Sequence, residues 1–244
     1  VSTERGHDVT LYEMSPDLGG NLFVASRPSF KDDMKRFLTY LTRRIESLSI
    51  DVRVGETVTP DTFRDEVPDV LFAAAGAEPY WPTIPGADGE NVFWAGDVFA
   101  SRVDTGKRVV LAGGGATGCE TALLLSQAGK EVVLLEQLPD LAEDANMVNR
   151  ILLLKLLAEE EVDTRPETTL QSITSAGVTA RDSDGREEEI PADSVVLALG
   201  MSPRSKVVDE LAHIAPEFYA IGDCVHPRLV FDAIHEAFDA AIEV

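Results

Sequence analysis

Short, unbroken apolar runs alternate with longer helical patterns along most of this chain. Five runs lack the alternation of apolar and polar residues that marks a half-exposed strand: residues 8–12, 70–75, 108–112, 131–135 and 194–199. Such runs are typical of parallel strands covered on both faces by helices. Helical periodicity occupies residues 31–48, 115–128 and 146–161. The pattern therefore predicts an α/β fold with doubly wound, Rossmann-like units.

The second half of the chain has the clearest order of elements. A strand at residues 108–112 is followed by a helix at 115–128, which Gly129 ends, and by a strand at 131–135. Residues 168–190 then alternate around two glycine-containing turns, which predicts a small antiparallel meander.

The chain repeats itself. The segment GHDVTLYE that begins at Gly6 resembles the segment GKEVVLLE that begins at Gly129, 123 positions later. A second pair of segments, 70–79 and 195–203, makes Gly76 equivalent to Gly200. Self-similarity at offsets of 123 and 124 positions predicts two copies of a single α/β unit.

A glycine-rich turn stands between the strand and the helix of the second copy. Gly113 is expected to allow a tight turn, Gly115 to let the backbone approach a pyrophosphate, and Gly118 to let the helix pack on the strand. Ala116 and Thr117 then present the N–H groups of the helix N-terminus to the phosphates. In this strand–turn–helix context the glycines predict a dinucleotide site rather than a turn alone.

Glu136 ends the next strand, where its carboxylate can accept hydrogen bonds from both hydroxyls of an adenosine ribose. It would repel a 2′-phosphate, and no arginine follows it directly. The sequence therefore predicts NAD(H) in preference to NADP(H). Gly200, at the end of the last strand, is expected at the same site.

The first copy lacks its glycine turn, because the position equivalent to Gly113 would precede Val1. Glu13 keeps the place of the ribose acceptor. We therefore expect the chain to be a piece of a longer polypeptide, without the first strand and helix of this unit. Alternatively, Val1 is a natural start and Glu13 only ends a strand.

Composition narrows the possible partners. The net charge of −22 repels nucleic acid and anionic lipid, and no apolar run is long enough to span a bilayer. The two cysteines show neither a CxxC pair nor zinc-ligand spacing, which predicts no metal site and favours the cytoplasm.

Three further segments carry a family resemblance that covers essentially the whole chain. They are LGG at residues 18–20, AAGAEP at 74–79, and YAIGDCV at 219–225 with its continuation to Phe238. With the glycine turn, they resemble the C-terminal region of the NADH:flavin oxidoreductase, 2,4-dienoyl-CoA reductase and trimethylamine dehydrogenase family, whose fold is glutathione reductase-like.

The resemblance implies an FAD domain at residues 1–102 and 208–244, interrupted by an NAD(P)H domain at 103–207. It places Glu13 on the FAD adenosine ribose, Gly20 at the pyrophosphate and Asp223 on the ribitol. Ala75, Gly76 and Gly222 adjoin this site. Asp223 also follows a strand and a glycine, which suits a carboxylate that accepts hydrogen bonds from sugar hydroxyls.

The resemblance further implies hydride transfer from NADH to FAD and electron transfer to an N-terminal TIM-barrel module that carries FMN and an iron–sulfur cluster. Because the phosphate-binding loop of the first unit would precede Val1, FAD is expected to bind weakly to this chain or not at all. No side chain is assigned as a catalytic acid or base, and a homo-oligomer is possible. The alternatives are a structural adenine-nucleotide site, as in amine dehydrogenases, and a free-standing NADH–ferredoxin-type reductase.

Overall fold

The computed structural model describes the backbone of residues 1–244 and every side chain except that of residue 29. The chain forms two compact units. The first unit combines Val1–Glu78 with Met201–Val244, and the second consists of Pro79–Gly200. The second unit is thus inserted into the first, in the order expected from the sequence.

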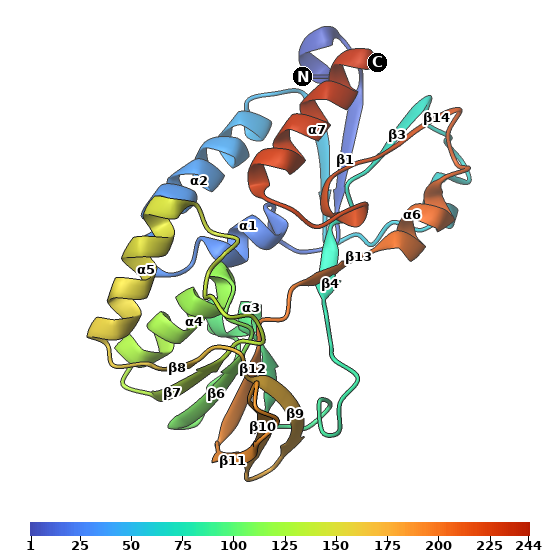
Figure 1. Ribbon diagram of the computed structural model, residues 1–244. Coiled ribbons are helices and arrows are strands. Elements are labelled where there is room, and N and C mark those ends of the chain that lie inside the picture. Colours follow the sequence, from blue (N-terminus) through green and yellow to red (C-terminus); the bar gives the residue numbers. More distant parts are fainter. The chain divides into compact units, whose positions relative to one another are not determined.

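The second unit is built on a five-stranded parallel sheet (Figure 1). Its strands lie in the order β5 (Val92–Trp94), β12 (Ser194–Leu197), β6 (Arg108–Ala112), β7 (Glu131–Leu135) and β8 (Asp163–Arg165). The bounds of β6 and β7 agree with the sequence prediction, because both strands are unbroken apolar runs with polar or glycine residues at their ends.

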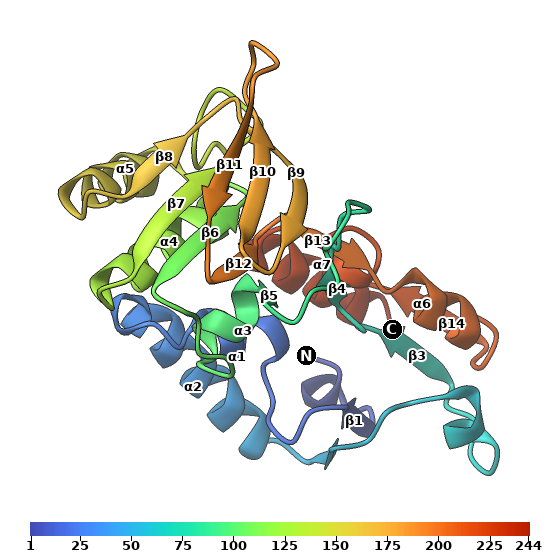
Figure 2. The ribbon, with the colours of Figure 1, turned by 90° about the horizontal axis from the view of Figure 1, so that it is seen from below.

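The two faces of this sheet are covered differently. One face packs against α3 (Ala95–Phe99), α4 (Ala116–Gln127) and α5 (Met147–Glu159). The other packs against a three-stranded antiparallel sheet of β9 (Thr169–Thr174), β10 (Gly177–Arg181) and β11 (Glu187–Pro191), seen in Figure 2. The expectation of helices on both faces was therefore wrong for this unit, because the predicted meander supplies the second layer.

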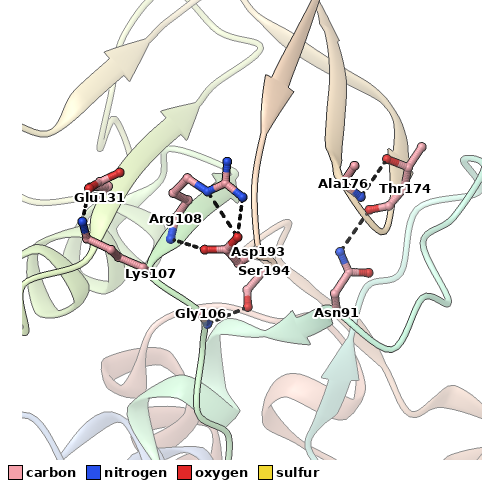
Figure 3. A network of polar contacts seen from close by, with 9 residues as sticks. All are labelled: Asn91, Gly106, Lys107, Arg108, Glu131, Thr174, Ala176, Asp193 and Ser194. Atoms are coloured by element: carbon pink, nitrogen blue, oxygen red, sulfur yellow. Dashed lines mark hydrogen bonds and ion pairs between the residues drawn. The ribbon is translucent and has the colours of Figure 1, made fainter.

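Polar contacts join the strands at the amino ends of this sheet (Figure 3). The Asp193 carboxylate accepts from the backbone N–H of Arg108 at 2.9 Å and from its Nη2 at 2.5 Å. These hydrogen bonds lower the pKa of Asp193 to about 2. Lys107 pairs with Glu131 at 2.7 Å. The contacts hold β6 against its neighbours at the end of the sheet opposite the glycine turn, so we assign them a structural role.

The first unit contains three strand pairs. These are β1 (Val9–Glu13) with β2 (Ile50–Val54), β3 (Val70–Ala73) with β14 (Glu217–Ala220), and β4 (Ala77–Pro79) with β13 (Met201–Pro203). Its helices are α1 (Gly20–Ala25), α2 (Asp32–Glu46), α6 (Ser205–Leu211) and α7 (Val230–Glu243). Short 3₁₀ turns cover Thr3–Arg5, Ser29–Lys31, Pro60–Phe63 and Gly222–Cys224.

The sheet of the first unit is divided where that of the second is continuous. In the second unit, β6 lies between β12 and β7 and pairs with both. By the repeat, β3 and β1 are the equivalents of β12 and β7. Among the described residues, none forms a strand that pairs with both β1 and β3. The edges of β1 and β3 equivalent to those that contact β6 are therefore unpaired within this chain.

The compact units change at residues 79 and 201, whereas the expected domain boundaries were 103 and 207. The first difference has a clear cause. Strand β5 pairs with β12, and Ala95 and Val98 of α3 belong to the apolar core under α4. Residues 92–99 therefore lie in the second unit. Among the described helices, none is both long and apolar enough to cross a membrane.

The central strands make the core sensitive to truncation. Leu111 is fully buried in β6, whereas Leu152 on α5 is 55% exposed. We expect Leu111→Ala to lower the free energy of unfolding by about 2–5 kcal/mol, because the substitution leaves a cavity. Leu152→Ala, the same chemical change on a surface, should cost less than about 0.5 kcal/mol. Urea titrations followed by circular dichroism measure both, and equal losses would contradict the core described here.

Candidate functional site

The glycine turn between β6 and α4 adopts a backbone that side chains would obstruct. Gly113 has φ +103°, and a Cβ added to it would overlap the carbonyl oxygen of Ala198. A Cβ on Gly118 would overlap the carbonyl oxygen of Gly113. These two glycines therefore let the helix begin directly against the end of β6, as the sequence predicted.

Glu136 is joined to the middle of this turn. Its Oε2 accepts from the backbone N–H of Gly114 at 2.5 Å, and its Oε1 accepts from the N–H of Leu138 at 2.7 Å. The side chain is only 8% exposed. Two N–H donors keep this buried carboxylate beside the glycine turn, at the carboxyl end of β7, where a ribose acceptor is required.

Gly114 is a site residue that the sequence analysis did not single out. A Cβ at this position would lie 2.7 Å from Cβ of Glu136 and would overlap a methyl group of Leu141. Any larger residue would therefore separate Glu136 from the turn. The middle glycine of the GGG run was the available signal, but the need for glycine there depends on Glu136 and Leu141, which lie more than 20 positions away.

Gly115 and Ala116 begin α4. Gly115 is the N-cap residue and has extended backbone angles. The N–H of Ala116 points to a carboxylate oxygen of Asp144 at 2.7 Å. Thr117 occupies the next position of the first turn, and Thr121 Oγ1 donates to its carbonyl oxygen at 2.7 Å. The N-terminus of α4 thus has an N–H group that binds an anion, and within the chain the carboxylate of Asp144 is that anion.

The repeat extends to individual hydrogen bonds. Oε1 of Glu13 accepts from the N–H of Ser15 at 2.7 Å, as Oε1 of Glu136 does from Leu138. The carbonyl oxygen of Ser15 accepts from Gly55 at 2.9 Å, and that of Leu138 from Glu167 at 3.0 Å. Gly55 and Glu167 both have positive φ. The two copies therefore share one turn, which gives the two glutamates the same backbone setting.

The two settings differ in their second donor. The described residues provide Glu13 with one backbone N–H, whereas Glu136 has two. The missing donor is the counterpart of Gly114.

Four other sequence-predicted residues lie at the carboxyl ends of paired strands in the first unit. Ala75 and Gly76 follow β3, and Gly222 and Asp223 follow its partner β14. Gly76 has φ +71°, and the space beside its Cα is open. Asp223 accepts from the N–H of Arg228 at 3.1 Å. These groups therefore share one edge of the strand pair.

Gly20 and Gly200 are the two remaining glycines that the sequence predicted at a nucleotide site. Gly20 begins α1, with φ +49° and open space where a Cβ would lie. Gly200 ends the second unit after β12, where its carbonyl oxygen accepts from the N–H of Tyr80 at 3.1 Å. No described contact joins Gly200 to the glycine turn, so its place in a nucleotide site stays a prediction.

Arg204 is a second residue that the sequence analysis missed. Its backbone N–H donates to the carbonyl oxygen of Gly76 at 3.3 Å, and its Nη1 lies 3.1 Å from the sulfur of Met14. Its Nε is buried and has no hydrogen-bond partner among the described residues. A buried donor without a hydrogen-bond partner destabilises the folded protein. The guanidinium of Arg204, which contacts Met14 directly after Glu13, therefore fits an anionic ligand.

Neither cysteine has the setting of a nucleophile. Burial raises the pKa of Cys119 to about 12, and Asp144 and Glu136 add to the effect. Its Sγ lies 3.2 Å from the carbonyl oxygen of Gly114. Cys224 is 1% exposed, and its Sγ lies 3.1 Å from the carbonyl oxygen of Ala73. Both thiols therefore pack as small apolar groups.

Comparison with known proteins agrees with this geometry. The sequence profile of the pyridine nucleotide-disulphide oxidoreductases matches residues 29–241. The chain is 34% identical to an NADH oxidase of Thermoanaerobacter brockii, and the alignment covers 100% of this chain and 38% of the relative. It is 31% identical to a cinnamate reductase of Clostridium sporogenes, over 99% of this chain and 36% of the relative.

A solved structure is also similar over the whole chain. The 2-naphthoyl-CoA reductase complex superimposes with a TM-score of 0.94 at 31% identity, covering 100% of this chain and 37% of that one. The chain thus spans well under half the length of these relatives. The resemblance stated from the sequence, and the two-unit fold that it implied, are confirmed.

The buried thiols give a direct test of the site's packing. We expect both cysteines to resist Ellman's reagent in the native protein at pH 8, since the pKa of Cys119 is about 12 and Cys224 is 1% exposed. Two thiols per chain should react after unfolding in guanidinium chloride. Fast reaction of one thiol in the folded protein, traced by mass spectrometry, would contradict the packing of that cysteine.

Proposed function

This chain belongs to the pyridine nucleotide-disulphide oxidoreductase family, and from that premise we propose that it is the dinucleotide-binding part of a flavoprotein oxidoreductase that passes hydride from NADH to FAD. One observation carries the proposal. The glycine turn of the second unit holds a buried carboxylate against the N-terminus of a helix, which is the arrangement that binds an adenosine ribose beside a pyrophosphate.

The second unit would hold NADH. Gly113 and Gly118 set the turn, Gly115 has no side chain that would obstruct a pyrophosphate beside the first turn of α4, and Ala116 and Thr117 offer N–H donors. Glu136 accepts from the ribose hydroxyls through the lone pairs that Gly114 and Leu138 leave free. Bound nicotinamide supplies the hydride, and the protein supplies orientation and electrostatics.

Glu136 supports a preference for NADH over NADPH. The carboxylate of Glu136 would repel the negative charge of a 2′-phosphate bound next to it. The nearest cation in register is Arg165, opposite Leu135. It is already paired with Asp163 at 2.9 Å and Glu188 at 2.7 Å. A 2′-phosphate would therefore meet a carboxylate and no unpaired cation on this pair of strands.

The first unit has groups that fit FAD. Glu13 would accept from its adenosine ribose, Asp223 from the ribitol hydroxyls, and Gly20, Ala75, Gly76 and Gly222 leave the backbone open near the chain of the cofactor. Arg204 adds a guanidinium with an unsatisfied Nε. The two glutamates have equivalent turns, which is the structural reason to expect an adenine nucleotide in both units.

The whole protein is proposed from its longer relatives. An N-terminal TIM-barrel module with FMN and an iron–sulfur cluster would receive the electrons and bind the final substrate. The cinnamate reductase and 2-naphthoyl-CoA reductase relatives favour reduction of a conjugated acid or thioester. Two unpaired cysteines suit a cytoplasmic location, and self-association is a further possibility for the assembled protein.

Exchange of the ribose acceptor tests the nucleotide preference. We expect Glu136→Arg to lower the ratio of the NADPH and NADH dissociation constants roughly tenfold or more, because a guanidinium can pair with a 2′-phosphate. Isothermal titration of both nucleotides gives the ratio. Glu189→Arg, the same change on the exposed strand β11, should leave it unaltered. An unaltered ratio in Glu136→Arg would remove this residue from the nucleotide site.

The two units should differ in cofactor retention. We expect the 244-residue chain to bind NADH but to be purified without FAD, since its described residues provide the first unit with no counterpart of the glycine turn and helix N-terminus that would bind the FAD pyrophosphate. Loss of two charge-assisted hydrogen bonds weakens binding roughly a hundredfold. The flavin absorbance spectrum, followed by FAD and NADH titrations in one buffer, measures this. Stoichiometric FAD after gel filtration would contradict the expectation.

A further inference from the structure

The loop after β7 places a carboxylate over the start of α4. Oδ1 of Asp144 accepts from the N–H of Ala116 at 2.7 Å. A Cβ added to Gly115 would lie 3.3 Å and 3.4 Å from the two carboxylate oxygens of Asp144. Asp144 therefore occupies the open space that a glycine at this position provides.

This space is the one that a dinucleotide pyrophosphate requires. An anion at a helix N-terminus is stabilised by the free N–H groups and by the helix dipole. A side-chain carboxylate satisfies the same donors as a phosphate oxygen does. Asp144 and a bound pyrophosphate therefore exclude each other at the Ala116 N–H.

Asp144 is not needed as a cap for its own helix. The N-terminus of α5 is capped by Asn146, whose side chain accepts from the N–H of Asn149 at 2.9 Å. The contact of Asp144 with Ala116 instead spans 28 positions of the chain. The local helix would keep its cap if the Asp144 side chain moved away.

The residues before Asp144 hold the loop close to the glycine turn. The N–H of Ala142 donates to the carbonyl oxygen of Gly114 at 2.7 Å, and Ala142 is fully buried with φ +52°. Arg150 Nε donates to the carbonyl oxygen of Leu141 at 2.7 Å. Asp144, by contrast, is exposed. Ala145, directly after it, packs against the apolar core and donates to the carbonyl oxygen of Ala142 at 3.1 Å. The backbone is therefore held on both sides of Asp144, and only its exposed carboxylate has to move.

We propose that Asp144 is an affinity-determining residue of the second unit: its carboxylate competes with the pyrophosphate of the incoming nucleotide and must leave the Ala116 N–H when the nucleotide binds. This proposal rests on the proposed NADH site. A protein whose site is mostly occupied by its own carboxylate binds more weakly in proportion to the open fraction. Removal of the competitor therefore strengthens binding without a new contact.

The competition acts on one part of the ligand. NADH and ADP carry a pyrophosphate, whereas adenosine carries only the base and the ribose that Glu136 would bind. Removal of Asp144 should therefore strengthen the binding of NADH and ADP and leave adenosine unaffected. A general change in the stability of the loop would affect all three ligands.

The test compares Asp144→Ala with the neighbouring Glu143→Ala in the full 244-residue chain. Glu143 is exposed as well, so the control removes one negative charge from the same loop. Isothermal titration with NADH, ADP and adenosine gives the dissociation constants. We expect Asp144→Ala to bind NADH and ADP about tenfold more tightly, and Glu143→Ala to change them less than about twofold. Asp144→Asn should fall between them, because its amide oxygen can still accept from Ala116.

A ligand-free measurement checks the contact itself. The Ala116 amide should exchange with deuterium faster in Asp144→Ala than in the wild type, and at an equal rate in Glu143→Ala. Unchanged or weaker NADH binding in Asp144→Ala, or an equal gain for adenosine, would overturn the competition. If neither the wild type nor Asp144→Ala binds NADH, the proposed function fails with it. If the wild type binds NADH and Asp144→Ala gains nothing, only the competition fails.

Discussion

The hydrogen bond from the Gly114 N–H to the Glu136 carboxylate is the contact on which the candidate site depends. It joins the turn after β6 to the end of β7 at 2.5 Å, and so fixes a ribose acceptor relative to the helix that faces the phosphates. It requires glycine, because a Cβ at residue 114 would lie 2.7 Å from Cβ of Glu136. Gly113 and Gly118 have no Cβ that would overlap the neighbouring backbone, so α4 can begin directly after this turn. Three backbone requirements and one carboxylate therefore specify the geometry of the proposed dinucleotide site.

The first unit offers a comparison, because it repeats the turn after the glutamate but not the contact with a glycine turn. Glu13 and Glu136 have the same turn hydrogen bonds two residues later. The strand that would carry the glycine turn has no equivalent among the described residues, and the sheet is divided at that place. A ribose acceptor without a phosphate cradle binds only part of a dinucleotide. Within the described residues, the difference between the two glutamates therefore lies in one strand–turn–helix element.

Local patterns predicted the parts of the fold that depend on neighbouring residues. Strands β6 and β7 were correct to the residue, since uninterrupted apolar runs ended by polar residues or glycine leave little choice. The repeat predicted two copies of one unit, and the family resemblance implied their inserted order. Strand β5 escaped prediction because three residues become a strand only through pairing with β12, about 100 positions away. Arg204 and Asp144 escaped for the same reason: their partners lie far along the chain, and no spacing rule marks them.

An acidic protein that binds a doubly charged pyrophosphate needs a favourable field at very short range. The chain carries a net charge of −22, and residues 113–118 contain no lysine or arginine. Backbone N–H groups at a helix N-terminus supply that field, since their dipoles act within a few ångströms and their positions are fixed before the ligand arrives. Such a site also attracts any carboxylate that can reach it, and the acidic loop at residues 137–146 has one in Asp144. Occupancy of the N-terminus of α4 by an internal carboxylate is therefore a natural consequence of the phosphate site that we propose there.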